Sequence, residues 1–160
     1  PEDRKVQGLI LDFSVSANIC LADLRAVSRR GFVDRRREAL RAVEQRDRLN
    51  IKAADVDRAT AELSGGNQQK VALGKWLALE PRVVIFDEPT RGIDVGSKAE
   101  IYDLMRRLAG RGVGILMISS DMEEVISVSD RIAVMCRGCI AGVLDPPDFS
   151  EQNVLTLAIG

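Results

Sequence analysis

The sequence predicts an α/β fold in which a helical segment is followed by a mainly parallel sheet with flanking helices. Residues 83–86 form a continuous apolar, β-branched run that ends in two acids, which is typical of a strand buried on both faces. Helical patterns lie on either side of this run and of a second apolar run, "VGILMIS", as in a layered sheet with right-handed crossovers. The 46% apolar content is ordinary, and the net charge of −1 favours no nucleic-acid partner.

The first 80 residues read as a helical subdomain. A loop with a short apolar segment comes first, and Asp34 can then cap a helix that runs to about Leu49. A longer helix should start at Asn67 and end near Leu79, because the proline two residues later cannot continue it. Arginines crowd residues 25–48 among acids, which fits either a solvated helix face or a surface for an anionic partner.

The second half alternates strands and helices. A helix is expected over residues 97–109, closed by Gly110, and the strand "VGILMIS" and the short helix "DMEEVISVS" follow it. Ser150 can cap a final helix, "EQNVLTLAI". The predicted parts are therefore a helical subdomain with its preceding loop, an α/β subdomain and a C-terminal helix, at residues 1–80, 81–149 and 150–160.

Two of the three cysteines enclose a predicted turn. Cys136 and Cys139 flank Arg137-Gly138 between two short apolar runs, which predicts a tight hairpin. Either the cysteines are incidental to that turn, or they form a metal or redox pair. The chain has no histidine, so a histidine base or metal ligand within it is excluded.

The stretch "LSGGNQQK" places Ser64, Gly65 and Gly66 where a helix should begin. A helix start leaves about four backbone N–H groups unpaired and carries roughly half a positive charge. Glycines let a ligand approach that backbone, and the Ser64 hydroxyl adds a further donor, so the stretch can receive a phosphate oxygen. A plain N-cap followed by flexible glycines is the alternative.

Asp87 and Glu88 end the first strand, at the edge where ligands bind in open α/β sheets. A carboxylate there can hold Mg²⁺, directly or through water. Its neighbour can orient or deprotonate an attacking water. The alternative is a pair of acids that only leads the strand into a loop.

The two sites occur in order with a helix between them, and together they resemble the nucleotide-binding domain of an ABC transporter, a P-loop NTPase. "LSGGNQQ" is similar to the signature motif of that family, "VVIFDE" to its Walker B strand, and "RGID", with Asp94, to its D-loop. The spellings "PEDRK", "GGNQQK" and "DEPTRGIDVGSK" resemble the second ATPase half of bacterial monosaccharide importers, and this likeness extends over essentially the whole chain.

The resemblance implies a subunit that hydrolyses ATP to import a simple sugar, with ATP and Mg²⁺ as cofactors. Its ATP would lie between the P-loop of one ATPase half and the signature of the other. The implied partners are a first ATPase half of the same chain or a second copy, together with permease subunits at the cytoplasmic face of the bacterial inner membrane. A half that completes its partner's site without hydrolysis, and a soluble protein acting on ribosomes or DNA, are the alternatives. The implied roles are catalysis for Glu88, metal binding for Asp87, the D-loop position for Asp94, the switch position for Ser120, and contact in trans with ATP for Ser64, Gly65, Gly66, Asn67 and Gln68.

Two features depart from the family pattern. No stretch matches the phosphate-binding motif G-x-x-x-x-G-K-[S/T]: Lys75 follows Gly74, but Gln69 stands at the earlier glycine position and Trp76 follows the lysine. We therefore expect a fragment that begins after this motif, is inactive alone, and self-associates through an uncovered sheet. Ser120 stands where the family commonly has histidine, so the nucleotide site of this half is expected to be degenerate.

Overall fold

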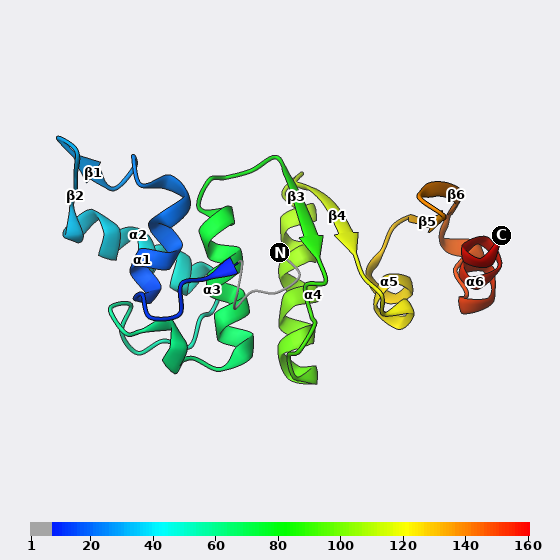
Figure 1. Cartoon of the computed structure of the whole chain (residues 1–160), viewed down its shortest axis with the longest axis horizontal. Helices are drawn as coiled ribbons and strands as arrows, with labels where there is room; N and C mark the ends of the chain where they lie inside the picture. Colours follow the sequence, from blue (N-terminus) through cyan, green and yellow to red (C-terminus); the bar gives the residue numbers. More distant parts are fainter. Residues whose placement is uncertain (1–7) are drawn as a thin grey trace. The chain divides into compact units, whose positions relative to one another are not determined.

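The computed structural model describes residues 8–160, so the "PEDRK" motif lies outside the described part (Figure 1). The chain divides into two compact units, Pro1–Leu116 and Met117–Gly160, and the division falls within β4. The predicted boundaries at residues 80 and 149 stay a prediction. In the first unit the elements are α1 (Val15–Cys20), η2 (Leu21–Asp23), β1 (Ser28–Arg29), β2 (Phe32–Val33), α2 (Arg35–Arg48), η3 (Thr60–Glu62), α3 (Gly65–Leu77), β3 (Val83–Asp87), α4 (Val95–Ala109) and β4 (Gly114–Ile118). In the second unit they are α5 (Met122–Val128), β5 (Ile132–Cys136), β6 (Cys139–Leu144), η4 (Pro146–Asp148) and α6 (Glu151–Ile159).

The helical part begins with a helix that the sequence did not predict. Residues 15–20, expected to be loop, form α1, because the Ser14 side chain caps the helix by accepting a hydrogen bond from the Ala17 amide. Val15 and Ile19 of α1 are fully buried, and α1 packs against both α2 and α3. This short helix therefore lies at the centre of the helical core.

Helix α2 confirms the predicted cap. The Asp34 carboxylate accepts hydrogen bonds from the amides of Arg36 and Arg37, and the helix ends one residue before the predicted end. Most of its arginines are exposed, as a solvated face requires. Arg41 and Arg46 are half-buried, and Arg41 pairs with Asp23 and donates to the Ala78 carbonyl at 2.6 Å, which ties α2 to the end of α3.

Helix α3 packs closely on its neighbours where it carries a glycine. A Cβ at Gly74 would lie 3.0 Å from Leu49 Cδ1 and 3.7 Å from Ile19 Cγ1. The glycine thus allows α3 to lie close to α1 and to the end of α2. The helix starts at Gly65 rather than at Asn67, because Ser64 has the extended backbone of an N-cap residue.

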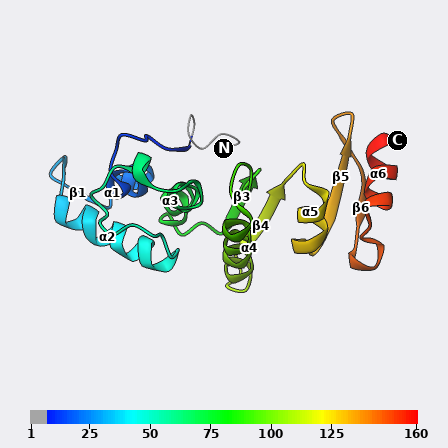
Figure 2. The same cartoon turned by 90° about the horizontal axis from the view of Figure 1, so that it is seen from below.

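Strands β3 and β4 pair with each other, and their arrows point the same way in both views (Figure 2). Helix α4 lies beside them, and its residues Ile101 and Leu108 are buried, as is Phe86 of β3. The prediction that this strand is buried on both faces was wrong: Val83 and Ile85 are each 63% exposed. A continuous apolar run indicates that both faces of a strand are apolar, but burial also requires other segments that pack on those faces.

The second unit contains the predicted hairpin. β5 and β6 pair antiparallel from Ile132↔Leu144 to Cys136↔Cys139, with a register shift between Val134 and Met135. Helix α6 packs on this hairpin, and its N-cap is Ser150, as predicted. The structure is therefore mixed helix and sheet, and its strands form three two-stranded sheets within residues 8–160.

Candidate functional site

The tip of α3 presents backbone amides and a hydroxyl. Ser64 is exposed and makes no side-chain bond to the helix that it caps. Its Oγ instead accepts a hydrogen bond from Asn67 Nδ2 at 2.9 Å, which leaves the hydroxyl hydrogen for another acceptor. The amides of Gly65, Gly66 and Asn67 belong to the first turn, where the helix supplies no partner for them.

Asn67 connects this tip to the chain that precedes it. Its Oδ1 accepts from the backbone amide of Lys52 at 2.8 Å, while its Nδ2 donates to Ser64. The Asn67 side chain is therefore occupied at both ends, and it fixes the loop around Lys52 beside the helix tip. Asn67 acts here as an orienting residue for the Ser64 hydroxyl.

Gly66 is buried against the start of α4. A Cβ at this position would lie 2.2 Å from Ser97 Oγ and 2.7 Å from Ser97 Cβ, much closer than real atoms approach. The space that sequence reasoning reserved for a ligand at Gly66 is therefore filled by Ser97. The approach that remains open to a ligand lies at Ser64, which is exposed, and at Gly65, which is half-buried.

Asp94 caps α4. Its Oδ1 accepts from the Ser97 amide at 2.9 Å and its Oδ2 accepts from the Ser97 hydroxyl at 2.8 Å. These hydrogen bonds, the backbone one first, hold the pKa of the exposed Asp94 carboxyl below its ordinary value. The helix consequently starts at Val95, two residues before the predicted start.

The tips of α3 and α4 enclose a shallow cavity of about 320 Å³. It brings together four of the predicted site residues, and two carboxylates on its wall already have partners: Asp94 accepts from Ser97, and Glu100 pairs with Lys70. No acid lies in the first turn of α3. Its lining residues are Lys52, Ser64, Gly66, Asn67, Asp94, Gly96, Ser97 and Glu100.

Gln68 points away from this cavity. The side chain is 6% exposed, and its Nε2 donates to the carbonyl oxygens of Thr60 and Leu63. Gln68 therefore holds the chain that enters the helix, and this orientation does not favour the predicted contact with ATP. Its Oε1 is buried without a hydrogen-bond partner in the structure.

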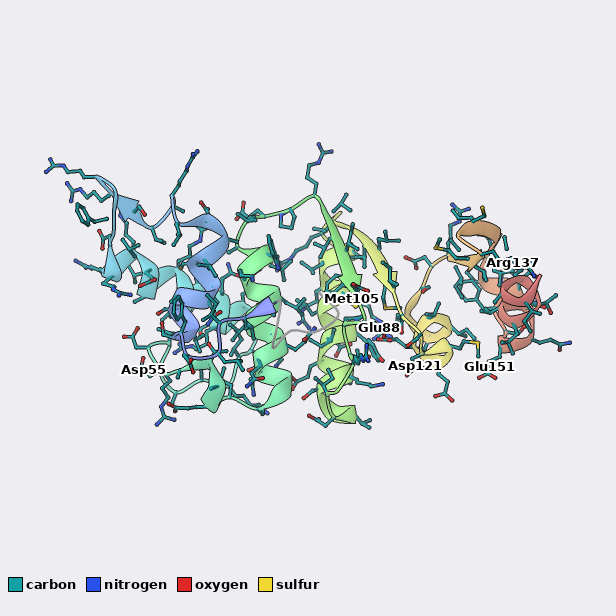
Figure 3. All side chains as sticks on the ribbon, in the orientation of Figure 1. Asp55, Glu88, Met105, Asp121, Arg137 and Glu151 are labelled. Atoms are coloured by element: carbon teal, nitrogen blue, oxygen red, sulfur yellow. The ribbon has the colours of Figure 1, made fainter. Side chains whose placement is uncertain are left out.

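Asp87 and Glu88 lie at the end of β3, where Figure 3 labels Glu88. Both are half-buried, and neither lines the cavity at the helix tips. Glu88 has a positive φ of 46°, a strained conformation for a residue with a side chain, and such strain is concentrated at functional sites. Glu88 shares a positive φ with Arg30, Asn50, Glu80 and Arg137, and among these five it is the one at a predicted site position.

Ser120, the predicted switch residue, belongs to the second unit and is exposed. The residues on either side are engaged locally: the Ser119 hydroxyl donates to Glu124, and Asp121 caps α5 by accepting from the Glu124 amide. Ser120 lies two residues after the end of β4, and its role as the switch position stays a prediction.

The dipeptide Gly74-Lys75 lies inside α3, as the sequence indicated. Lys75 Nζ donates to the Gly8 carbonyl at 2.6 Å and lies 5.1 Å from the centre of the Trp76 ring. Burial lowers the pKa of this amine, which is 7% exposed by residue. It supports the N-terminal segment and is no substitute for a phosphate-binding lysine.

Sequence reasoning missed four residues of the cavity: Lys52, Gly96, Ser97 and Glu100. Ser97 could have been found, because Asp94 followed three residues later by a serine is a helix-start pattern in which the cap accepts from that residue. Lys52 carries no such local signal, since its place depends on a contact with Asn67 fifteen residues away.

The arrangement at the tip of α3 is an anion receptor in chemical terms. It offers first-turn amides, one hydroxyl and the positive end of a helix, with Lys52 on the same wall. A metal site of the zinc kind has no comparable support, because no three cysteine, aspartate or glutamate side chains come together to bind an ion anywhere in residues 8–160.

The chain matches the family model described as ABC transporter over residues 5–91. It is 50% identical over 159 residues to the ribose import ATP-binding protein RbsA of Lactococcus lactis subsp. cremoris strain SK11, covering 99% of this chain and 32% of that protein. It is 49% identical to a putative ribose/galactose/methyl galactoside import ATP-binding protein of Rhizobium meliloti strain 1021, with the same coverage. The chain thus spans about a third of the length of these curated relatives.

Solved structures share the fold. The dimeric post-hydrolysis structure of the ATP-binding cassette MJ0796 with ADP and Pi has a TM-score of 0.71 at 24% identity, covering 88% of this chain and 60% of that one. An inward-facing putative metal-chelate type ABC transporter has a TM-score of 0.78 at 17% identity, covering 92% and 58%. These likenesses confirm the predicted fold class, that of the ABC ATPase cassettes.

Proposed function

Because this chain belongs to the ABC transporter family, we propose that it is part of the ATP-hydrolysing subunit that powers import of a simple sugar. The family binds ATP, and the relatives that match the whole chain at 48–50% identity are named for ribose import. The observation that carries the proposal is the amide-lined tip of α3, with Ser64 exposed beside a cavity. In this proposal the tip of α3 binds the terminal phosphate of ATP held by a partner domain.

The donor set fits a nucleotide phosphate. Phosphate oxygens accept hydrogen bonds, and the tip supplies amides, the Ser64 hydroxyl and the helix dipole. Of the two carboxylates nearby, Glu100 is paired with Lys70, whereas Asp94 keeps its negative charge and accepts two hydrogen bonds from Ser97. Ser64, oriented by Asn67, would donate to the phosphate in trans.

Asp87 and Glu88 supply the complementary chemistry at this domain's own nucleotide site. The Asp87 carboxylate has the hard oxygen donors that Mg²⁺ prefers, and it would hold the ion there. When bound, the ion neutralises phosphate charge. Glu88, held in its strained backbone, would orient the attacking water and accept its proton.

The spellings "GGNQQK" and "DEPTRGIDVGSK" support an assignment to the second ATPase half of a tandem subunit. The spelling "GGNQQK" and the solved dimeric cassette support pairing with a first half or a second copy. We place the subunit at the cytoplasmic face of the membrane, docked on permease subunits. Within residues 8–160 no helix has the length and apolarity to cross a bilayer.

The test measures ATP turnover in a subunit that supplies a P-loop half. Ser64→Ala should lower turnover by about 10²-fold, the cost of removing one phosphate or oxyanion donor. Glu88→Gln should lower it by a smaller factor, because the proposal makes this domain's own site the weaker one. Ser150→Ala is the matched control: it removes a serine that caps α6 through the Asn153 amide, and turnover should not change.

Unchanged turnover in Ser64→Ala would overturn the role of the α3 tip. Equal and total loss in Ser64→Ala and Glu88→Gln would refute the asymmetric assignment of the two sites. Unchanged turnover in Glu88→Gln would favour the alternative in which this half completes its partner's site without hydrolysis, as a serine at position 120 also favours.

A further inference from the structure

Two thiols flank the turn of the β5–β6 hairpin, in the second unit of the chain. Cys136 and Cys139 are register partners in the antiparallel ladder, at the end nearest the turn. The turn itself is Arg137-Gly138, and both residues have positive φ, 50° and 81°. Positive φ at both central residues is the signature of a two-residue type I′ turn, whose twist matches that of the strands.

This pairing brings the two cysteines within bonding reach. Directly opposed residues of an antiparallel pair have Cα atoms about 4.5–5.5 Å apart, and their side chains project from the same face. A disulfide requires a Cα separation of about 4.4–6.8 Å. The pairing of Cys136 with Cys139 therefore meets the Cα requirement for a disulfide.

The two thiols differ in access. Cys139 is exposed, whereas Cys136 is half-buried, and its Sγ would lie 3.8 Å from a Cβ built on Gly160. Both are free thiols in the structure. The Cys139 sulfur can thus react with a reagent from solvent, and the Cys136 sulfur lies at the opposite position of the ladder.

The third cysteine provides an internal contrast. Cys20 is fully buried in the helical core of the first unit, and its Sγ donates to the Glu38 carbonyl at 3.7 Å. Burial, reinforced by the Glu38 charge, raises the pKa of the Cys20 thiol to about 11. A reagent that needs an accessible thiolate should therefore pass Cys20 by.

We propose that Cys136 and Cys139 form an oxidation site that closes to an intramolecular disulfide by exchange with a small-molecule disulfide. The Cys139 thiolate attacks one sulfur of the reagent, forms a mixed disulfide and releases one thiol. The Cys136 thiolate then attacks the Cys139 sulfur and releases the second thiol. Two cysteine thiols are oxidised, the reagent is reduced to two thiols, and the two cysteine protons end on these leaving groups.

A closed metal site is less well supported by the same residues. Structural zinc takes four ligands, whereas the turn offers two, and no further candidate ligand joins them within the described residues. None of the residues assigned to nucleotide chemistry belongs to this hairpin, so the oxidation site stands independently of the proposed function.

The experiment treats the 160-residue chain with oxidised glutathione and follows intact mass, peptide mapping and non-reducing electrophoresis. The wild-type chain should lose the mass of two hydrogen atoms, with the link mapped to Cys136 and Cys139, and should retain a free thiol at Cys20. Dithiothreitol should restore the starting mass. Cys20→Ser should close in the same way.

Cys136→Ser and Cys139→Ser are the matched variants, because each leaves one thiol of the pair. Cys136→Ser should stop at a stable glutathione adduct on Cys139, and Cys139→Ser should react more slowly. Circular dichroism confirms that each variant keeps its secondary structure. A lasting glutathione adduct on the wild-type chain, a disulfide between two chains, or no reaction at all would overturn the proposal.

Discussion

Replacing Gly66 by alanine should destabilise the first unit, because the added methyl group has nowhere to go. It would lie 2.2 Å from Ser97 Oγ and 2.7 Å from Ser97 Cβ, where ordinary contacts begin at 3.4 Å. The hydroxyl can rotate away, but the Ser97 Cβ is fixed to α4. The tips of α3 and α4 would therefore have to separate by several tenths of an ångström or more.

The cost of such overpacking is about 1–3 kcal/mol. Alanine recovers up to about 1 kcal/mol of helix propensity over glycine, and less than that in a first turn. We therefore expect a net loss of roughly 1–2 kcal/mol in the free energy of unfolding, measured by urea titration at unchanged m-value.

A double variant isolates the cause. Ser97→Gly removes both atoms that the new methyl group meets, so Gly66→Ala should cost much less in that background than alone. Gly96→Ala is a control on the same cavity wall, because its nearest contact, Asp94 Oδ1 at 3.4 Å, is an ordinary one. Equal costs of Gly66→Ala in both backgrounds, or no cost at all, would refute the reasoning.

Three further predictions concern charge, thiol chemistry and association. Hydrogen bonds from Ser97 lower the pKa of Asp94, so the stability that its carboxylate contributes is present above pH 3.8 and is lost as the pH falls further. Asp94→Asn should therefore reduce the dependence of stability on pH in this acid range, measured by circular dichroism. The raised pKa of Cys20 acts in the opposite direction: the stability that the protonated thiol contributes is complete below pH 9.0 and is lost as the pH rises to about 11. The urea midpoint of the wild-type chain should therefore fall over this pH range, and Cys20→Ala should remove that part of the fall. The exposed apolar face of β3 should drive self-association of the isolated chain, and Ile85→Thr should reduce the mass found by light scattering, whereas a clean monomer of the wild-type chain at high concentration would count against the idea.

The sequence predicted the elements whose determinants are local. The Arg137-Gly138 turn was predicted because a two-residue link between strands requires positive φ at both positions. The caps at Asp34 and Ser150 were predicted because a short polar side chain before a helical pattern has one favourable use. The start of α3 was placed two residues late, because glycine is a poor helix former and its tolerance at a first turn was undervalued.

What the sequence could not give is the result of long-range packing. Nothing local shows that Ser97 would fill the space beside Gly66, or that Lys52 would bond to Asn67. The orientation of Gln68 likewise depends on the carbonyl oxygens of the preceding turn. Motif spacing thus indicated a helix tip that borders a cavity, while tertiary contacts decided which of its residues face outward.

These contacts give the two glycines of the stretch "LSGGNQQK" different structural roles. The lack of a side chain at Gly66 lets Ser97 of α4 pack directly against the α3 backbone, whereas Gly65 and Ser64 leave the backbone accessible to solvent. Because Ser97 also donates to Asp94, one side chain both fills the space beside Gly66 and fixes the cap of α4. Ser97 therefore joins the tip of α3 to Asp94 on a common cavity wall, so a substitution that removes the Ser97 side chain should disturb both positions at once.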